Sequence, residues 1–204
     1  MEELIELVKS LLNTEVNSRI EKRLSEFKKL GEKERKHLFS ELAFCILTAN
    51  FDAKRAIEIQ DKIEKGFLNY SEGKLAKKLK ELGYRFPNKR AEYIVEARKH
   101  LDELESIKDK EKPRKWLVEN IKGLGYKEAS HFLRNIGFGN YAIIDFHIID
   151  ILERHRIVEK PKTLTKGKYL KIEKILSELA EKLTMSLAEL DLYLWFLETG
   201  KILK

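Results

Sequence analysis

A lysine and an aspartate eighteen residues apart are the side chains of this sequence whose types and spacing point most directly to chemistry. Lys127 comes two residues after the tripeptide Gly123-Leu124-Gly125, in the expected first turn of a helix, and Asp145 follows a mostly apolar run. A helix dipole disfavours a cation at the helix N-terminus. Together with burial, this position favours the neutral amine of Lys127, which is the nucleophilic form.

The glycines before Lys127 indicate a tight hairpin between two helices. Gly123 and Gly125 permit a sharp turn because glycine adopts backbone dihedrals closed to other residues, and Leu124 can then be buried between the helices. The amides of the turn and of the next helix's first turn form an anion site suited to a DNA phosphate. The alternative is that the tripeptide only ends one helix and begins another.

Asp145 has two compatible interpretations. It is a natural N-cap for a helix that begins at Phe146, because its carboxylate can accept a backbone N–H of the first turn. An N-cap carboxylate at the edge of a cavity can still face a substrate. We therefore expect Asp145 to cap the helix and keep it as a candidate for catalysis.

The apolar residues recur at helical spacing almost throughout, and no segment alternates with period two over the length of a strand. We therefore predict an all-α protein of about eleven helices. Ser71 is a natural N-cap, and Pro113 suits a first helical turn. The expected helices are Glu2–Leu12, Asn17–Leu30, Glu32–Thr48, Ala53–Lys65, Ser71–Leu82, Asn88–Leu104, Pro113–Ile121, Tyr126–Asn135, Asp145–His155, Lys166–Leu183 and Leu187–Thr199.

The composition favours a polyanionic partner. The 204 residues carry a formal net charge of +7, and each Lys or Arg that neutralises a phosphate releases a counterion. Cys45 is the single cysteine, which excludes an internal disulfide and a four-cysteine metal or iron–sulfur site. No apolar run approaches the ~20 residues that span a bilayer, and the start has no signal-peptide pattern. We expect a cytoplasmic protein without a membrane partner.

The hairpin Ile121–Leu133 followed by Ala142–Ile148 resembles the helix-hairpin-helix/Gly-Pro-Asp superfamily of base-excision DNA glycosylases. That superfamily has a hairpin of Gly-x-Gly-x-Lys type and an aspartate eighteen positions beyond the lysine, as here. The chain lacks the C-terminal four-cysteine cluster of endonuclease III-like members and ends in Lys204. In these two features the chain resembles the second family of 8-oxoguanine glycosylases, which is found in archaea and some bacteria.

The resemblance implies two helical lobes with the active site in the cleft between them. Residues 1–35 and 140–204 would form a discontinuous terminal lobe, and residues 36–139 a lobe containing the hairpin 113–135. It also implies a monomer that needs no metal or cofactor and that acts on double-stranded DNA containing 8-oxoguanine. The damaged nucleotide would be extruded into a pocket. Lys127 would then attack C1′ of its sugar, form a Schiff base and nick the strand by β-elimination, while Asp145 stabilises positive charge on the sugar.

Several residues are candidates for contact with DNA. By resemblance, Asn50 fills the space that the extruded base leaves, unless it only occupies a helix–helix turn. Arg85 and Phe86, in an aromatic and basic loop, suit a phosphate contact and a wedge between bases, although Phe86 can also pack onto its own helix. His147 resembles the family's Asp-x-His motif and is interpreted as making a structural or phosphate hydrogen bond.

The expected base pocket involves the end of the chain. Trp195 is either an aromatic wall for the flipped base or a core residue. The α-carboxylate of Lys204 would accept the N7 proton that distinguishes 8-oxoguanine from guanine, unless the tail is frayed. Two other functions remain open: a glycosylase/lyase for another oxidised base, and a non-enzymatic helix-hairpin-helix module that only binds DNA. The Lys127/Asp145 pair argues against the second.

Overall fold

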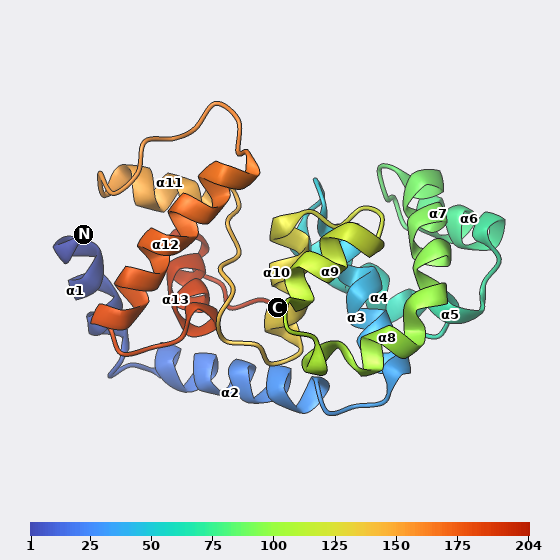
Figure 1. Ribbon diagram of the computed structural model, residues 1–204, viewed down its shortest axis with the longest axis horizontal. Helices are drawn as coiled ribbons and strands as arrows, with labels where there is room; N and C mark the ends of the chain where they lie inside the picture. The colour runs from blue at the N-terminus through green and yellow to red at the C-terminus, as the bar shows by residue number, and fades with distance from the viewer. The chain divides into compact units, whose positions relative to one another are not determined.

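A computed structural model describes all residues from 1 to 204, and every regular element in it is a helix (Figure 1), which confirms the all-α prediction. The chain divides into two compact units, one of residues 1–29 and 137–204 and the other of residues 30–136. The boundaries expected from the sequence were 35/36 and 139/140, six and three residues further along the chain. Both termini therefore belong to the first unit, which we call the terminal unit, and the second is called the hairpin unit.

The terminal unit is organised around α13, a mostly apolar helix that is buried from Leu187 to Leu194 apart from Glu189. Tyr193 is completely buried on it, and its hydroxyl donates a hydrogen bond to Asn17 on α2. The guanidinium of Arg154 on α11 forms a two-pronged ion pair with Glu198 on α13, at 2.9 and 3.0 Å. The helices of this unit are α1 (Glu2–Leu11), α2 (Glu15–Leu30, which runs to the boundary), α11 (Phe146–Arg154), α12 (Lys166–Lys182) and α13 (Leu187–Thr199).

The hairpin unit is organised around α3, which is buried from Leu38 to Thr48 apart from the half-buried Ser40, and this stretch includes Cys45. A buried polar network joins α3 to α10: Asn135 donates to the Glu41 carboxylate at 2.6 Å, and Arg134 donates to the Asn135 side-chain carbonyl at 2.9 and 3.0 Å. Such groups are tolerated in a core because they are hydrogen-bonded. The helices are α3 (Arg35–Thr48), α4 (Ala53–Ile63), α5 (Gly66–Asn69), α6 (Glu72–Glu81), α7 (Pro87–Ala97), α8 (Leu101–Glu105), α9 (Pro113–Asn120) and α10 (Tyr126–Asn135), with 3-10 turns η1 (Arg98–His100) and η2 (Ile107–Asp109).

The largest departure from the expected helices lies in the range 88–104. The prediction of one continuous helix there is wrong, because η1 separates α7 from α8. At this break Arg98 donates to the carbonyls of Phe67 and Tyr70, at 2.8 and 2.7 Å. This tie comes from a distant part of the chain, so no local glycine or proline marks the break. The short helix α5 was also not anticipated.

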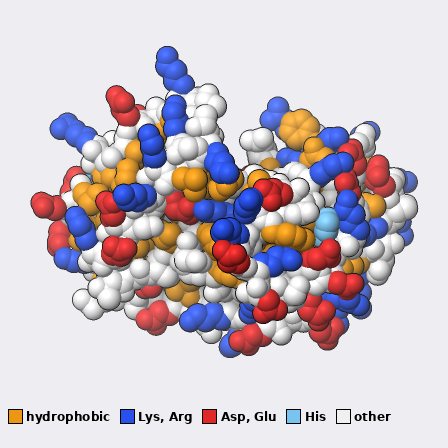
Figure 2. Space-filling view, viewed as in Figure 1, with side chains coloured by type: hydrophobic (Ala, Val, Ile, Leu, Met, Phe, Trp, Pro, Cys, Tyr) orange, Lys and Arg blue, Asp and Glu red, His pale blue; other side chains and the backbone are white.

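The surface carries charges of both signs. On the face in Figure 2, Lys and Arg side chains are interspersed with Asp and Glu, and they do not gather into one large patch. The helices are either too short or too polar to cross a bilayer.

Candidate active site

The turn between α9 and α10 has the backbone that the glycines predicted. Gly123 has φ +86°, a left-handed conformation that favours glycine. A Cβ at this position would lie 2.5 Å from Cδ2 of Tyr93, so the packing also requires glycine. Leu124 is buried, as expected for a residue that pins the hairpin. The Gly-Leu-Gly tripeptide is thus a tightly packed hairpin turn.

Lys127 lies in the first turn of α10, and its side chain is 28% exposed. Its Nζ is 3.5 Å from Oε1 of Glu128, and Oε2 of the same carboxylate accepts the Gly125 N–H at 3.2 Å. Sequence reasoning missed Glu128, although a glutamate three residues after an N-cap is a known capping pattern. Because Glu128 already occupies the Gly125 amide, a phosphate at this turn would bind through the other amides.

Asp145 caps α11, and its side chain accepts the Ile148 N–H at 3.0 Å, which confirms the N-cap interpretation. The extended segment before it is fixed to α12 by two residues that the sequence analysis did not single out. The Tyr169 hydroxyl donates to the Ala142 carbonyl at 2.7 Å, and Glu173 accepts the Ala142 N–H at 3.0 Å. These bonds hold the half-buried Asp145 at a defined place in the terminal unit.

Two aromatic side chains lie next to Asp145 along α11. Phe146 is 63% exposed, and its ring centroid is 3.9 Å from that of His147. The His147 ring in turn meets Trp195 of α13 edge-on, at 4.7 Å. Trp195 is half-buried, and its Nε1 is buried without a hydrogen-bond partner. His147, two residues after Asp145, and Trp195 are therefore brought together.

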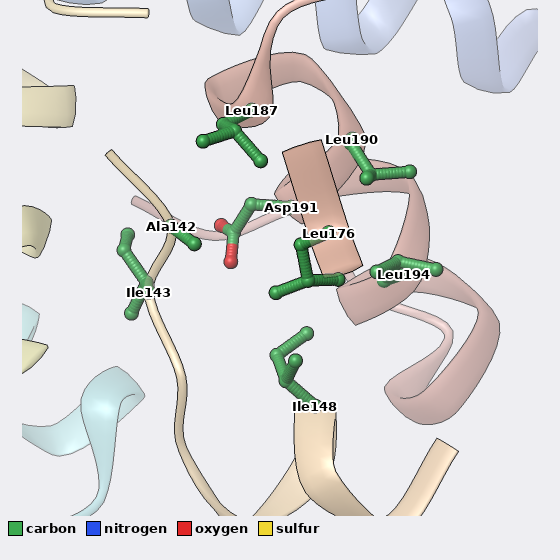
Figure 3. A pocket seen from close by; sticks show the side chains of 8 residues that line it. All are labelled: Ala142, Ile143, Ile148, Leu176, Leu187, Leu190, Asp191 and Leu194. Carbon is green, nitrogen blue, oxygen red and sulfur yellow. The ribbon is translucent and has the colours of Figure 1, made fainter. Parts of the chain in front are cut away.

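Ala142 and Ile143, in the extended segment before Asp145, line one side of a small apolar pocket (Figure 3). Asp191 extends from α13 into it, with its carboxylate directed toward Ala142 and Ile143. Asp191 is only 7% exposed. Its position could not be anticipated from the sequence, where it stands in an otherwise apolar run.

The last residues continue past the end of α13 at Gly200, which has φ +69°. Ile202 is buried, and Lys204 is half-exposed. The burial of Ile202 distinguishes this segment from a fully exposed tail.

The two candidate DNA-probing loops both lie in the hairpin unit. Asn50 is exposed at the turn between α3 and α4 and has φ +57°, a conformation that asparagine tolerates better than most residues. Phe86 is 43% exposed before α7, and the Arg85 guanidinium stacks over its ring at 4.9 Å. Of the candidates, the hairpin unit holds Gly123, Gly125, Lys127, Asn50, Arg85 and Phe86, and the terminal unit holds Asp145, His147, Trp195 and Lys204.

The all-helical chain thus has Lys127 at the start of the second hairpin helix and Asp145 as the cap of a later helix, the arrangement that the resemblance to helix-hairpin-helix DNA glycosylases implied. Comparisons with known proteins agree. Residues 20–185 match the family described as 8-oxoguanine DNA glycosylase. The chain belongs to that family.

Relatives and solved structures resemble the chain over its full length. The 8-oxoguanine DNA glycosylase/AP lyase of Korarchaeum cryptofilum is 50% identical, covering 100% of this chain and 99% of the relative. The protein of that name from Methanocaldococcus jannaschii is 51% identical, covering 98% and 99%. The crystal structure of the M. jannaschii 8-oxoguanine glycosylase/lyase in complex with 15mer DNA containing 8-oxoguanine has a TM-score of 0.96 at 48% identity, over 99% of this chain and 100% of that chain. The Thermotoga maritima 8-oxoguanine DNA glycosylase structure has a TM-score of 0.94 at 44% identity, over 100% and 99%.

Proposed function

We propose that this chain is a bifunctional 8-oxoguanine DNA glycosylase/AP lyase of base excision repair. It removes 8-oxoguanine from double-stranded DNA and then nicks the strand, acting as a monomer in the cytoplasm. The observation that carries the proposal is Lys127 at the start of α10, directly after a tightly packed glycine hairpin. The full-length relatives that bear this name support the choice of lesion.

Lys127 supplies the nucleophile. The lone pair of its neutral Nζ attacks C1′ of the extruded nucleotide, and the bond from C1′ to N9 of the base breaks. The base leaves with the bonding electrons and takes up a proton. The sugar ring of the lysine adduct then opens to a Schiff base. Loss of a proton from C2′ expels the 3′ phosphate, which is the β-elimination that nicks the strand.

Asp145 stabilises the positive charge that develops on the sugar as the base leaves. Its bond to the Ile148 amide and the ties of the preceding segment to α12 fix the carboxylate before substrate binds. Electrostatic groups are most effective when they are preorganised in this way, because no reorganisation is needed during the reaction. The capping and catalytic roles are thus compatible.

The remaining candidates bind the DNA and the base. Trp195 stacks on the flipped base, and the α-carboxylate of Lys204 accepts its N7 proton. The Trp195 ring meets His147, two residues after Asp145, and this contact supports the role. Asn50 occupies the space left by the base, and Phe86 is the wedge, with Arg85 contacting phosphate. The other amides of the turn that Gly123 and Gly125 form, together with His147, contact the phosphates of the DNA.

Borohydride trapping on duplexes with single defined lesions tests this proposal. The wild-type protein should form a covalent complex with 8-oxoguanine duplex, and Lys127→Gln should abolish it. Lys122→Gln is a matched control, because Lys122 lies in the same hairpin and is ion-paired with Glu96 at 2.8 Å. Undiminished trapping by Lys127→Gln would overturn the nucleophile assignment. A preference for another oxidised base would overturn the lesion assignment alone.

A further inference from the structure

The turn that carries Asn50 and the loop that carries Phe86 are hydrogen-bonded to each other, although three helices, α4, α5 and α6, separate them in the sequence. The Tyr84 hydroxyl donates to the Leu47 carbonyl at 2.7 Å. Arg90 donates from Nη2 to the Ala49 carbonyl at 3.1 Å and from Nε to the Tyr84 hydroxyl at 3.3 Å. The last residues of α3 and the turn after it are therefore hydrogen-bonded to the segment around Phe86.

Aromatic and cationic contacts strengthen this connection. The Phe51 ring packs on the Tyr84 ring at 4.4 Å, and the Arg55 guanidinium lies 5.2 Å from the Phe51 ring. Arg55 also donates to the Gly83 carbonyl at 3.2 Å. Tyr84 is almost fully buried, and burial raises the pKa of its phenol, so it stays a neutral donor. We call Tyr84, Arg90, Phe51 and Arg55 the loop clamp.

The loop clamp fixes the segments that flank Asn50 and Phe86, the exposed residues at the tips of the two loops. Asn50 lies between Ala49, whose carbonyl is bonded to Arg90, and Phe51, whose ring is packed on Tyr84. Phe86 follows Tyr84 by two residues and precedes Arg90 by four. Thus residues on either side of each tip are held by hydrogen bonds or ring contacts, while the side chains of Asn50 and Phe86 are exposed.

We infer that Tyr84 and Arg90 are positioning residues that make Asn50 and Phe86 enter duplex DNA as a single, preorganised two-pronged probe. This inference rests on the proposed DNA contacts of Asn50 and Phe86. The physical reason is the cost of ordering: two independently mobile loops would each lose conformational freedom on insertion, whereas clamped loops have lost it on folding. Opening of the base pair, not the chemistry at Lys127, is the step that the clamp accelerates.

The test compares two arginines of the same kind. Arg90→Lys removes the planar fork that reaches Ala49 and Tyr84, and a lysine cannot replace both bonds. Arg98→Lys is the matched control, because Arg98 is another half-buried arginine that donates to two backbone carbonyls, those of Phe67 and Tyr70, away from both loops. Tyr84→Phe is a second variant, which keeps the ring and removes the hydroxyl that bonds to Leu47 and Arg90.

Single-turnover excision should be measured with 8-oxoguanine paired to cytosine, and lyase activity with a preformed abasic site in single-stranded DNA. Arg90→Lys and Tyr84→Phe should each lower excision from the duplex by about three- to tenfold, the scale of one or two lost hydrogen bonds. Lyase activity on the single strand should be unchanged in both. Arg98→Lys should leave both activities at wild-type level after correction for any difference in stability.

Single and double variants distinguish the positioning role of Tyr84 and Arg90 from the DNA contacts of Asn50 and Phe86 on which that role rests. If Asn50→Ala and Phe86→Ala leave duplex excision intact, the proposed DNA contacts fail. If those variants are impaired but Arg90→Lys behaves like Arg98→Lys, the clamp inference alone fails. The inference expects that Arg90→Lys adds little to the defect of Asn50→Ala, because both act on the same probe. Full additivity, or an equal loss of single-strand lyase activity, would overturn it.

Discussion

Replacement of Gly123 by alanine should destabilise the protein in two separable ways. The first is conformational: at φ +86° an L-residue costs about 1–2 kcal/mol. The second is steric, since the new Cβ would lie 2.5 Å from Cδ2 of Tyr93, and overpacking of this kind typically costs ~1–3 kcal/mol. The free energy of unfolding of Gly123→Ala should therefore fall by ~2–5 kcal/mol, the combined range of these two effects.

Two other glycines of this chain separate the contributions. Gly200 has φ +69° but open space around its Cβ position, so Gly200→Ala should lose only the conformational ~1–2 kcal/mol. Gly73 lies in α6 with open space and without a positive φ, so Gly73→Ala should gain ~0.4–1 kcal/mol. Guanidinium unfolding followed by far-UV circular dichroism should rank the four proteins as Gly73→Ala, wild type, Gly200→Ala and Gly123→Ala, from most to least stable.

The steric part has its own control. A second substitution, Tyr93→Ala, removes the ring that the new Cβ meets, so its cost should be smaller in the Gly123→Ala background than in the wild type. If Gly123→Ala is no less stable than Gly200→Ala, or if the two substitutions are simply additive, the reasoning about the packed turn is refuted.

Four further results are expected. Asp145→Asn should keep the helix cap but lower single-turnover excision by ~10²-fold or more, whereas Asp145→Ala should also lose ~1 kcal/mol of stability in thermal unfolding; normal excision by the Asn variant would leave the residue only its capping role. Burial, together with the carboxylates of Glu189 and Glu21, raises the pKa of Tyr193 to about 12 in the folded protein. The neutral Tyr193 phenol therefore contributes fully to stability below the pKa of an unfolded tyrosine, near ~10, and this contribution is lost as the pH rises through the pKa of the folded protein. Tyr193→Phe should therefore show a shallower alkaline decline in stability, and parallel curves would contradict this. Deletion of Lys204, or extension of the chain beyond it, should sharply reduce 8-oxoguanine excision but spare lyase action on abasic DNA; retention of both activities would place lesion recognition elsewhere. Nonspecific DNA affinity should fall with salt at a log–log slope of roughly −0.9 per phosphate neutralised, and a flat response would exclude the basic side chains as the DNA contacts.

The sequence predicted those features that are encoded locally. The helix Tyr126–Asn135 was expected with the bounds that the structure has, because glycine at its start and apolar residues at helical spacing lie within one short segment. The caps at Ser71 and Asp145 were predictable for the same reason: an N-cap side chain binds an amide only three residues later.

The features that sequence reasoning missed depend on contacts between distant segments. Asn135 and Glu41 are 94 residues apart in the chain, and nothing in the periodicity around either one marks the hydrogen bond between them. In the sequence, Arg90 cannot be told from the other charged residues of a basic segment, and only the fold shows that it donates a hydrogen bond to the carbonyl of Ala49. Polar pairs of this kind leave no periodic signal, whereas apolar stripes do.

The division into two compact units also gives each of them its own spectroscopic reporter. The chain has two tryptophans, and Trp116 belongs to the hairpin unit while Trp195 belongs to the terminal unit. Cys45, the single thiol, is completely buried within the hairpin unit and becomes reactive only when that unit opens. A Trp116→Phe variant would thus report the terminal unit by fluorescence and the hairpin unit by thiol labelling in the same sample. Coincident transitions would identify one cooperative folding unit, and separate transitions would identify two.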